Sequence, residues 1–484
     1  MIVHDRRDRH HPGRDAPPAS GAAARPGLTL VAASLALFLV DLDFFALNLA
    51  LPAVAGDLGV SVTYLQWVIA GYMLALGAFL IPGGRLGDIL GRRRTLIAGI
   101  AVFSGASTVC GLVNDPNLVI AFRVVQGTGA AMIFPVCVAV ITNAFPPEGR
   151  KRAIGNLYGL AAVAVAVGPF FGGFVTEAIS WRGVFLVNLP LGAIAIALAL
   201  AGIRESRDET VPRRIDFLGL GLVAVGIGAI TFGVDGGEDH GWASTQVLVP
   251  ILGGLGLLAA FVLAEARARF PLIDLSLFRN LPYVVVTLLG MVANVAFVTT
   301  TFSAAIYLQQ VRDLSPIEAG AIYLAASVTT AIAGPLSGRL GERFNVPPLM
   351  AASMLVGAAG LLVISFDTAY AAFIPALLVF GLGYGLCWSL ASVGTQTVVA
   401  TEKAGAASGV TLAIVIGVAG LSVAVVTAII DGLVGGGTSQ GDAIESVWRV
   451  AAIASALLGV ALGLAGRWTR PATAAFTSSR SALR

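Results

Sequence analysis

Long apolar runs dominate this chain of 484 residues. There are fourteen, each about 20 residues long, which is the length a helix needs to cross a hydrocarbon core of roughly 30 Å. Lipid offers no hydrogen-bond partner to the backbone, so we predict that every run is a helix. Only 12% of the residues are charged, against roughly 25% in a soluble domain. The chain is therefore predicted to be an all-α membrane protein, with spans near 28–51, 63–83, 95–113, 117–139, 153–177, 183–203, 215–235, 246–266, 282–307, 317–337, 347–366, 370–393, 404–431 and 443–466.

A pentapeptide recurs in the two halves of the chain. Residues 84–88 read GRLGD, and residues 338–342, 254 positions later, read GRLGE. Each copy follows the second span of a set of six, and internal repeats of this kind are typical of secondary transporters. The spans are therefore ordered 6+2+6. We predict a disordered cytoplasmic tail over 1–27, a six-helix bundle over 28–203, a linker with two helices over 204–281, a second six-helix bundle over 282–466 and a cytoplasmic tail over 467–484.

The basic residues predict that both termini are cytoplasmic. With the termini inside, only Arg182, Arg312 and Arg449 lie outside and Arg123 lies within a span, which leaves 26 of the 30 Lys and Arg residues on cytoplasmic segments. An excess of this kind follows the positive-inside rule. The net charge of +3 thus reflects topology and does not indicate a nucleic-acid partner. We expect a multi-pass protein of the cytoplasmic membrane.

Seven short motifs occur in the order known from one transporter family. With them the chain resembles the major facilitator superfamily, specifically its fourteen-span drug:proton antiporter branch. The resemblance implies a major facilitator fold, in which two six-helix bundles and two linker helices give fourteen transmembrane helices. Phe45 departs from the branch, which often has Thr there. The motifs are 42–52 (LDFFALNLALP), 84–94 (GRLGDILGRRR), 123–129 (RVVQGTG), 168–173 (GPFFGG), 181–190 (WRGVFLVNLP), 307–310 (YLQQ) and 315–316 (SP).

The same resemblance implies proton-coupled efflux of amphipathic drugs or antibiotics by alternating access. An uptake carrier of the same superfamily, a symporter or facilitator for a small metabolite, is the alternative. Neither is an enzyme, and proton-motive force would drive transport without a cofactor or metal. The partners would be a small amphipathic substrate, protons and the bilayer, with the protein acting as a monomer. ATP is not expected to bind, because the only lysines, Lys151 and Lys403, do not follow glycine and no P-loop can form.

Few ionisable residues lie well inside the spans, and such residues are costly enough to mark function. Asp43 lies eight residues before the outer end of span one, about 12 Å deep, and Arg123 of span four lies roughly 9 Å deep. A dry site favours a protonated carboxyl group, whereas a nearby arginine favours the charged form. Movement of Arg123 relative to Asp43 would therefore load or release a proton. A static ion pair is the alternative, and Asp41, on another side of the helix, is the weaker carrier.

The remaining acids near the membrane fall at the ends of spans. Because water can reach such positions, we expect the second half to contribute no proton carrier and a single acid to suffice. These acids are Glu177, Asp235, Glu265, Glu318, Asp367 and Asp431.

Two groups of residues are expected to control the conformational change. The basic turn after span two would cap a helix and pair Asp88 with an arginine across the turn, although topogenic charge alone could explain it. The small residues of span five would permit a bend and close helix contact, with ordinary small-residue packing as the alternative. The gating residues are Gly84, Asp88, Gly91, Arg92, Arg93, Gly168, Pro169, Gly172 and Gly173, with Gly338, Arg339 and Glu342 in the second copy.

A substrate cavity is expected between the two halves, near the middle of the membrane. Aromatic faces combined with a few polar tips suit an amphipathic ligand, although each such residue could equally serve helix packing. The predicted lining residues are Asn48, Trp67, Tyr72, Gln126, Asn294, Phe297, Tyr307 and Tyr323.

Overall fold

The computed structural model describes residues 25–62, 64–207, 216–268, 273–366, 369–399 and 404–467. Helices make up nearly all of these segments, as predicted, and the described part contains no strand. The predicted tails over 1–27 and 467–484 lie almost wholly outside the described residues. Within these segments thirteen helices are long and apolar enough to cross a membrane, and a shorter apolar helix at Leu218–Val234 lies in the remaining predicted span.

The first group of helices corresponds to the first six predicted spans. Its sixth span is divided in two, which the sequence did not predict. Pro190 has no N–H to donate to the carbonyl of Leu186, where the first short helix ends. The helices are α1 (Pro26–Leu58), α2 (Gln66–Leu90), α3 (Arg92–Leu112), α4 (Pro116–Ala144), α5 (Pro147–Ala178), α6 (Arg182–Leu186) and α7 (Asn188–Gly202).

Two further helices, which pack against each other, follow the first group. They are α8 (Phe217–Asp235) and α10 (Thr245–Arg267), joined by the single turn α9 (Gly237–His240). Helix α8 also contacts α2 and α15, so the pair lies alongside both groups. A short 3-10 helix, η1 (Leu275–Arg279), leads into the last group.

The last group contains six long helices. The first of them continues into a π-helical turn that carries the YLQQ motif, and such turns are often found at functional sites. The elements are α11 (Leu281–Ile306), η2 (Tyr307–Val311), α12 (Pro316–Arg343), α13 (Val346–Ile364), α14 (Tyr370–Val398), α15 (Ala404–Gly435) and α16 (Gln440–Arg467).

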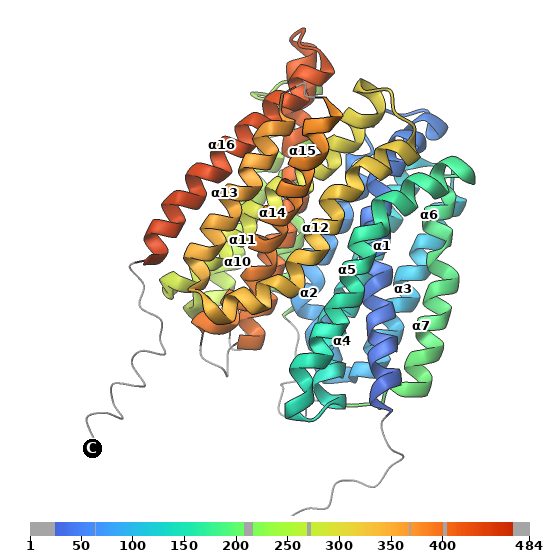
Figure 1. Cartoon of the computed structure of the whole chain (residues 1–484), viewed down its shortest axis with the longest axis vertical. Helices are drawn as coiled ribbons and strands as arrows, with labels where there is room; N and C mark the ends of the chain where they lie inside the picture. The colour runs from blue at the N-terminus through green and yellow to red at the C-terminus, as the bar shows by residue number, and fades with distance from the viewer. Residues whose placement is uncertain are drawn as a thin grey trace, which may run out of the picture.

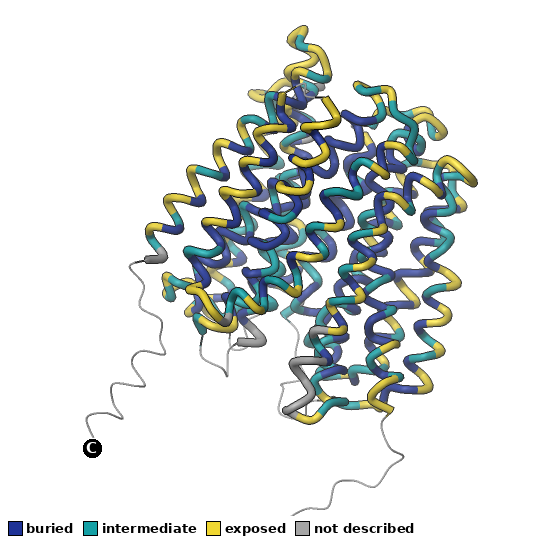
Figure 2. Tube along the Cα trace, viewed as in Figure 1, coloured by how far each residue is buried: buried dark blue, intermediate teal, exposed yellow. Residues whose placement is uncertain are grey.

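The two groups stand side by side and touch along two seams (Figure 1). Helix α5 packs against α12 along one seam, and α2 packs against α15 along the other. The chain enters α1 and leaves α16 at the same end of the molecule, which we call the inner end, following the orientation predicted from the basic residues. Buried residues line the surfaces where helices face one another, and exposed apolar residues lie on the outward surfaces (Figure 2). Apolar outward surfaces suit contact with lipid.

Candidate functional site

Asp43 and Arg123 meet in the interior of the first group. Asp43 lies in α1 and Arg123 in α4, and both side chains are fully buried. Arg123 Nη1 donates a hydrogen bond to Asp43 Oδ2, which makes the contact an ion pair. The similar depths estimated from the sequence thus correspond to a direct contact.

Three more polar side chains surround this ion pair. Gln126 Nε2 and Asn188 Nδ2 both donate to Asp43 Oδ1, at 2.9 and 2.7 Å. Gln126 Oε1 accepts from Arg123 Nη1 at 2.8 Å, and Asn188 Nδ2 also donates to Ser107 Oγ at 2.9 Å. Sequence reasoning missed Asn188 and Ser107. Asn188 does belong to the 181–190 motif, which was the available signal.

The cluster retains unused hydrogen-bonding capacity. Arg123 Nε donates to Val68 O at 3.0 Å, and the guanidinium lies 4.2 Å from the centre of the Tyr72 ring. Arg123 Nη2, Asn188 Oδ1 and the Tyr72 hydroxyl are buried without a hydrogen-bond partner among the described residues. These spare donors and acceptors would allow the cluster to rearrange.

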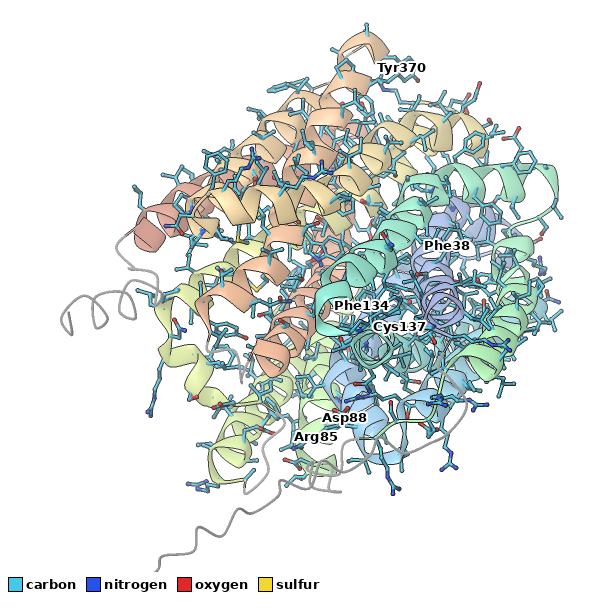
Figure 3. All side chains as sticks on the ribbon, turned by 60° about the horizontal axis from the view of Figure 1, so that its bottom comes forward. Phe38, Arg85, Asp88, Phe134, Cys137 and Tyr370 are labelled. Atoms are coloured by element: carbon cyan, nitrogen blue, oxygen red, sulfur yellow. The ribbon has the colours of Figure 1, made fainter. Side chains whose placement is uncertain are left out.

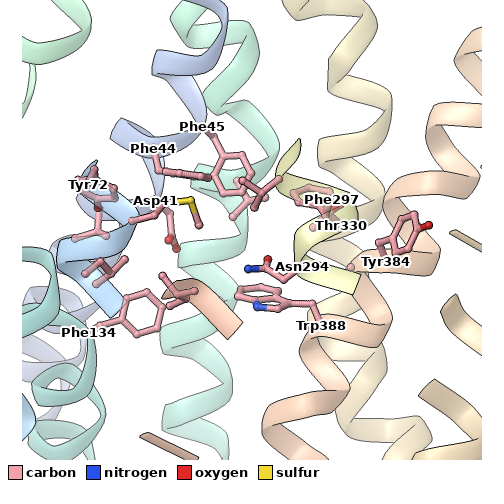
Figure 4. Close-up of a pocket in the computed structure, with 17 residues that line it drawn as sticks. Asp41, Phe44, Phe45, Tyr72, Phe134, Asn294, Phe297, Thr330, Tyr384 and Trp388 are labelled. Carbon is pink, nitrogen blue, oxygen red and sulfur yellow. The ribbon is translucent and has the colours of Figure 1, made fainter. Parts of the chain in front are cut away.

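A cavity of about 80 Å³ lies between the two groups, beside this cluster. Its wall combines α1, α2, α4 and α5 of the first group with α11, α12, α14 and α15 of the last group. Tyr72 belongs to both the cavity wall and the cluster, so it connects the two. Aromatic rings dominate the wall (Figure 4): Phe44, Phe45, Tyr72, Phe134, Phe297, Tyr384 and Trp388.

Asp41 also lines this cavity, two residues before Asp43. The side chain has no hydrogen bond and no ion pair with any other described residue. Asp43, in contrast, accepts from three side chains and lies outside the cavity wall. The two acids of α1 are therefore in different environments.

Three of the eight predicted lining residues line the cavity, namely Tyr72, Asn294 and Phe297. The other five lie outside the wall of this cavity. Gln126 belongs to the Asp43 cluster, and Asn48 is buried and donates to Phe44 O of its own helix at 2.8 Å. Trp67 is half-buried in the first turn of α2, at the outer end.

The two remaining tyrosines face the interior of the last group. Tyr323 shares a hydrogen bond with the Thr301 hydroxyl. Tyr307 donates to Glu445 Oε1 at 2.7 Å and accepts from Arg312 at 3.2 Å. Because both hydroxyl groups are satisfied within their own helix group, these side chains hold helices together and do not face the cavity.

Glu445 is a buried acid of the last group. It lies on α16, is 9% exposed and was absent from the acids considered in the sequence. Glu265, expected at a water-accessible end, is 3% exposed and accepts from the Ile273 backbone at 3.0 Å. Both acids are held in local hydrogen bonds away from the cavity.

The basic turn at the inner end is held together by two acids. Asp88 pairs with Arg92 at 2.8 Å, one helical turn along the chain, and Figure 3 shows Asp88 and Arg85 at this end. Glu205, just after α7, accepts from the backbone N–H groups of Arg93 and Arg94 at 3.1 and 3.2 Å. A carboxylate at that position caps α3 and complements its dipole.

Gly91 is essential to the geometry of this turn. Its φ is +114°, a conformation that side-chain-bearing residues rarely adopt, and an added Cβ would lie 2.5 Å from Glu205 Cδ. Gly84, nearby on α2, packs against the ring of Pro135. In the second copy of the motif Gly338 borders open space, and the Glu342 side chain lies outside the described part. No ion pair of Arg339 is found among the described residues.

The small residues of α5 allow two close helix contacts at the outer end. A Cβ on Gly168 would lie 2.6 Å from Phe45 Cβ, and one on Gly172 would lie 2.7 Å from Ala46 Cα, both on α1. A Cβ on Gly173 would lie 2.8 Å from Pro316 C of α12. Gly172 therefore serves packing within the first group, whereas Gly173 serves contact between the groups.

Polar contacts reinforce the outer closure between the groups. Glu177 of α5 accepts from the Ile317 N–H of α12 at 3.1 Å, and Gln309 of the π-helical turn donates to Leu49 O of α1 at 3.0 Å. Pro169 O lies 2.9 Å from the position of a Cβ on Gly320. The outer ends of α5 and α12 are thus tied together.

Two groups of apolar helices that enclose a cavity between them define a multi-pass membrane transporter. The chain belongs to the Major Facilitator Superfamily, whose family model matches residues 33–424. Membership of this family, together with the candidate spans, places the protein in the cell membrane.

Named relatives cover most of the chain. It is 38% identical over 392 residues to the cephamycin export protein CmcT of Amycolatopsis lactamdurans, which covers 78% of this chain and 80% of the relative. It is 35% identical over 391 residues to the multidrug resistance protein Stp of Mycobacterium tuberculosis, covering 79% and 72%.

Solved structures support the fold. The peptide transporter POT in complex with sulfate matches with a TM-score of 0.64 at 14% identity, covering 91% of this chain and 95% of that one. An inward-facing bacterial homologue of the transporter Spinster matches with a TM-score of 0.63 at 18% identity, covering 92% and 98%. At such identities the likeness concerns the fold alone.

Proposed function

We propose that this protein exports amphipathic, aromatic drugs or antibiotics across the cell membrane by alternating access. The observation that carries the proposal is the aromatic cavity between the two helix groups. Pockets that bind drug-sized ligands likewise have an apolar wall with few polar groups. The relatives include a cephamycin export protein and a multidrug resistance protein, which favours export over uptake.

Transport requires the outer ends of the two groups to separate. The Glu177–Ile317 and Gln309–Leu49 hydrogen bonds and the Gly173 contact would have to open together. The substrate passes unchanged, without a cofactor, so the protein acts as a carrier and not as an enzyme. Because one chain encloses the cavity by itself, the protein would function as a monomer.

Protons entering the cell supply the energy in this proposal. The Asp43–Arg123 pair is the coupling site, because a proton on Asp43 would remove the charge that holds Arg123. Tyr72, which stacks on Arg123 and lines the cavity, transmits the change to the substrate. A membrane potential of 100 mV supplies about 2.3 kcal/mol per charge, which is enough for more than a tenfold concentration ratio.

Dye efflux from cells tests this function. Wild type, Asp43→Asn and the control Asp313→Asn are compared at equal expression, with and without an uncoupler. Asp313 is an exposed residue with φ of 56° on the outer surface, a conformation that asparagine tolerates. We expect the uncoupler and Asp43→Asn each to abolish efflux and the control to retain it. Uncoupler-sensitive efflux that survives Asp43→Asn would move the proton site elsewhere, and net dye accumulation would favour an uptake carrier.

A further inference from the structure

The segment that joins α11 to α12 contacts the first group at two places. Gln309, in the π-helical turn η2, donates to Leu49 O of α1 at 3.0 Å. The first turn of α12 meets α5 at Gly173 and at Glu177. Both contacts belong to residues 307–317, which we call the outer connector. A shift of the outer connector would therefore alter the outer closure between the groups.

Glu445 of α16 holds the start of the outer connector. Tyr307 donates to Glu445 Oε1 at 2.7 Å. The Tyr307 hydroxyl accepts in turn from Arg312 Nε at 3.3 Å and from Arg312 Nη2 at 3.2 Å. Tyr307 thus joins a carboxylate on α16 to a guanidinium that lies directly after the π-helical turn.

Helix α16 also packs against both ends of the π-helical turn. The Tyr307 ring is buried, stacks on Phe373 with ring centres 6.2 Å apart and lies 5.0 Å from the Trp448 ring, one turn beyond Glu445 on α16. At the other end of the turn, a Cβ on Gly441 of α16 would lie 2.9 Å from Val311 Cγ1. The turn therefore rests on α16 while its Gln309 reaches the first group.

The other charged residues in the outer half of α16 have partners elsewhere. Asp442 accepts from Ser439 Oγ at 2.6 Å, in the loop before the helix. Arg449 donates to Ser365 O at 2.9 Å, just after α13. Glu445 is the charged side chain of this half that bonds to the outer connector.

We propose that Glu445 is a positioning residue for the outer closure. Through Tyr307, its carboxylate holds the π-helical turn in the arrangement that places Gln309 against Leu49 O. Hydrogen bonds to a charged acceptor are about twice as strong as those to a neutral one, so the charge on Glu445 favours the outer-closed arrangement. The inference rests on the alternating access of the proposed function and assigns part of its control to a residue outside the cavity wall.

Spin-label distances in the purified full chain test whether Glu445 acts on the closure. The labels are attached at Ile179→Cys and Val434→Cys, two exposed outer positions, one in each group. Glu445→Gln keeps the length of the side chain and replaces the charged acceptor by a neutral one. We expect the ratio of open to closed molecules to rise by about threefold to tenfold. Asp442→Asn, a matched charge removal on the same helix, should leave the ratio unchanged.

A double-mutant cycle tests whether Glu445 acts through the outer connector. Gln309→Ala removes the hydrogen bond to Leu49 O, to which Glu445 makes no direct contribution. If Glu445 positions Gln309, the two substitutions are coupled although their side chains have different partners. Glu445→Gln should then shift the ratio less than half as much in the Gln309→Ala background as in wild type. A role in stability alone would lower Tm in both backgrounds without changing the ratio.

Each other outcome decides against a defined part of the argument. An unchanged ratio in Glu445→Gln, or an equal shift in both backgrounds, would overturn the positioning role and leave the export function standing. If Glu445→Gln does not elute as a folded, monodisperse protein, Tyr307→Phe takes its place in the same cycle, because it removes the donor to Glu445 and keeps the ring. Absence of dye efflux by wild type would refute the proposed function, whereas the distances, which require no substrate, would still decide the role of Glu445.

Discussion

Gly173→Ala should shift the protein away from the outer-closed arrangement. Gly173 is the point where α5 touches α12 of the other group, and a Cβ there would lie 2.8 Å from Pro316 C. The adjacent Gly172 touches α1 of its own group instead. Gly173→Ala should therefore favour separation of the outer ends, whereas Gly172→Ala should mainly lower stability.

The size of the effect follows from the overlap. Ordinary Cβ contacts begin at 3.4 Å, and the Pro316 carbonyl oxygen lies even nearer to the added Cβ than Pro316 C does, so α5 and α12 must move apart by more than about 0.6 Å to accept the methyl group. Overpacking of this kind costs about 1–3 kcal/mol. This overpacking destabilises only the arrangement in which the outer ends are closed. Every 1.4 kcal/mol corresponds to about a tenfold change in the ratio of open to closed molecules. We therefore expect the ratio of open to closed molecules to rise by about fivefold to a hundredfold.

Spin-label distances across the outer surface measure this ratio. Labels on Ile179→Cys, after α5, and Val434→Cys, near the end of α15, use side chains that are 75% and 40% exposed. The three native cysteines are buried and should not react. Gly256→Ala on α10, where a Cβ meets nothing within 4 Å, is the matched control. An unchanged distance distribution in Gly173→Ala, or an equal shift in Gly172→Ala, would refute the reasoning.

Three further predictions concern local contacts. Glu205→Gln removes the charge that caps α3 and should lower the free energy of unfolding by about 1 kcal/mol, seen as a lower Tm in detergent; an unchanged Tm would contradict the capping role. Tyr307→Phe leaves the buried Glu445 without its donor and should cost about 1–3 kcal/mol by the same assay, whereas a loss below that range would show that Glu445 has other support. Glu177→Gln weakens the cap on α12 and should shift the spin-label distances in the same direction as Gly173→Ala but less; a shift toward closure would exclude this role.

The helices could be predicted because lipid leaves the backbone no alternative. The span predicted over 215–235 corresponds to α8, Phe217–Asp235, and that over 95–113 to α3, Arg92–Leu112. The similar depths of Asp43 and Arg123 could be estimated because both helices begin or end at the same surface, and this made a contact between them possible. Asn188 could not be placed so simply, because its contact with Asp43 depends on how α7 is rotated about its axis.

Rotation about the helix axis also makes cavity-lining residues hard to predict. In a soluble helix, apolar periodicity shows which side is buried, but these helices are apolar on all sides and the signal disappears. Phe297 and Tyr307 lie ten residues apart along the same span, about 15 Å at the rise of a helix, and of these two Phe297 lines the cavity. For this pair the depth in the membrane, and not the rotation, makes the difference.

The hydrogen-bond donors and acceptors around Asp43 give the proposed coupling a physical basis. The Asp43 carboxylate accepts from Arg123, Gln126 and Asn188, and an ionised carboxylate can satisfy all three donors. Protonation of Asp43 turns one of its oxygens into an O–H donor. Because both oxygens now face N–H donors, at least one of these three hydrogen bonds must break. Asn188 Oδ1 has no partner among the described residues. If the Asn188 side-chain amide rotates, this oxygen can accept a hydrogen bond from the new O–H group of Asp43. Arg123 would then lose its counter-charge while still stacked on Tyr72, and a change at Asp43 would reach the cavity wall through that ring.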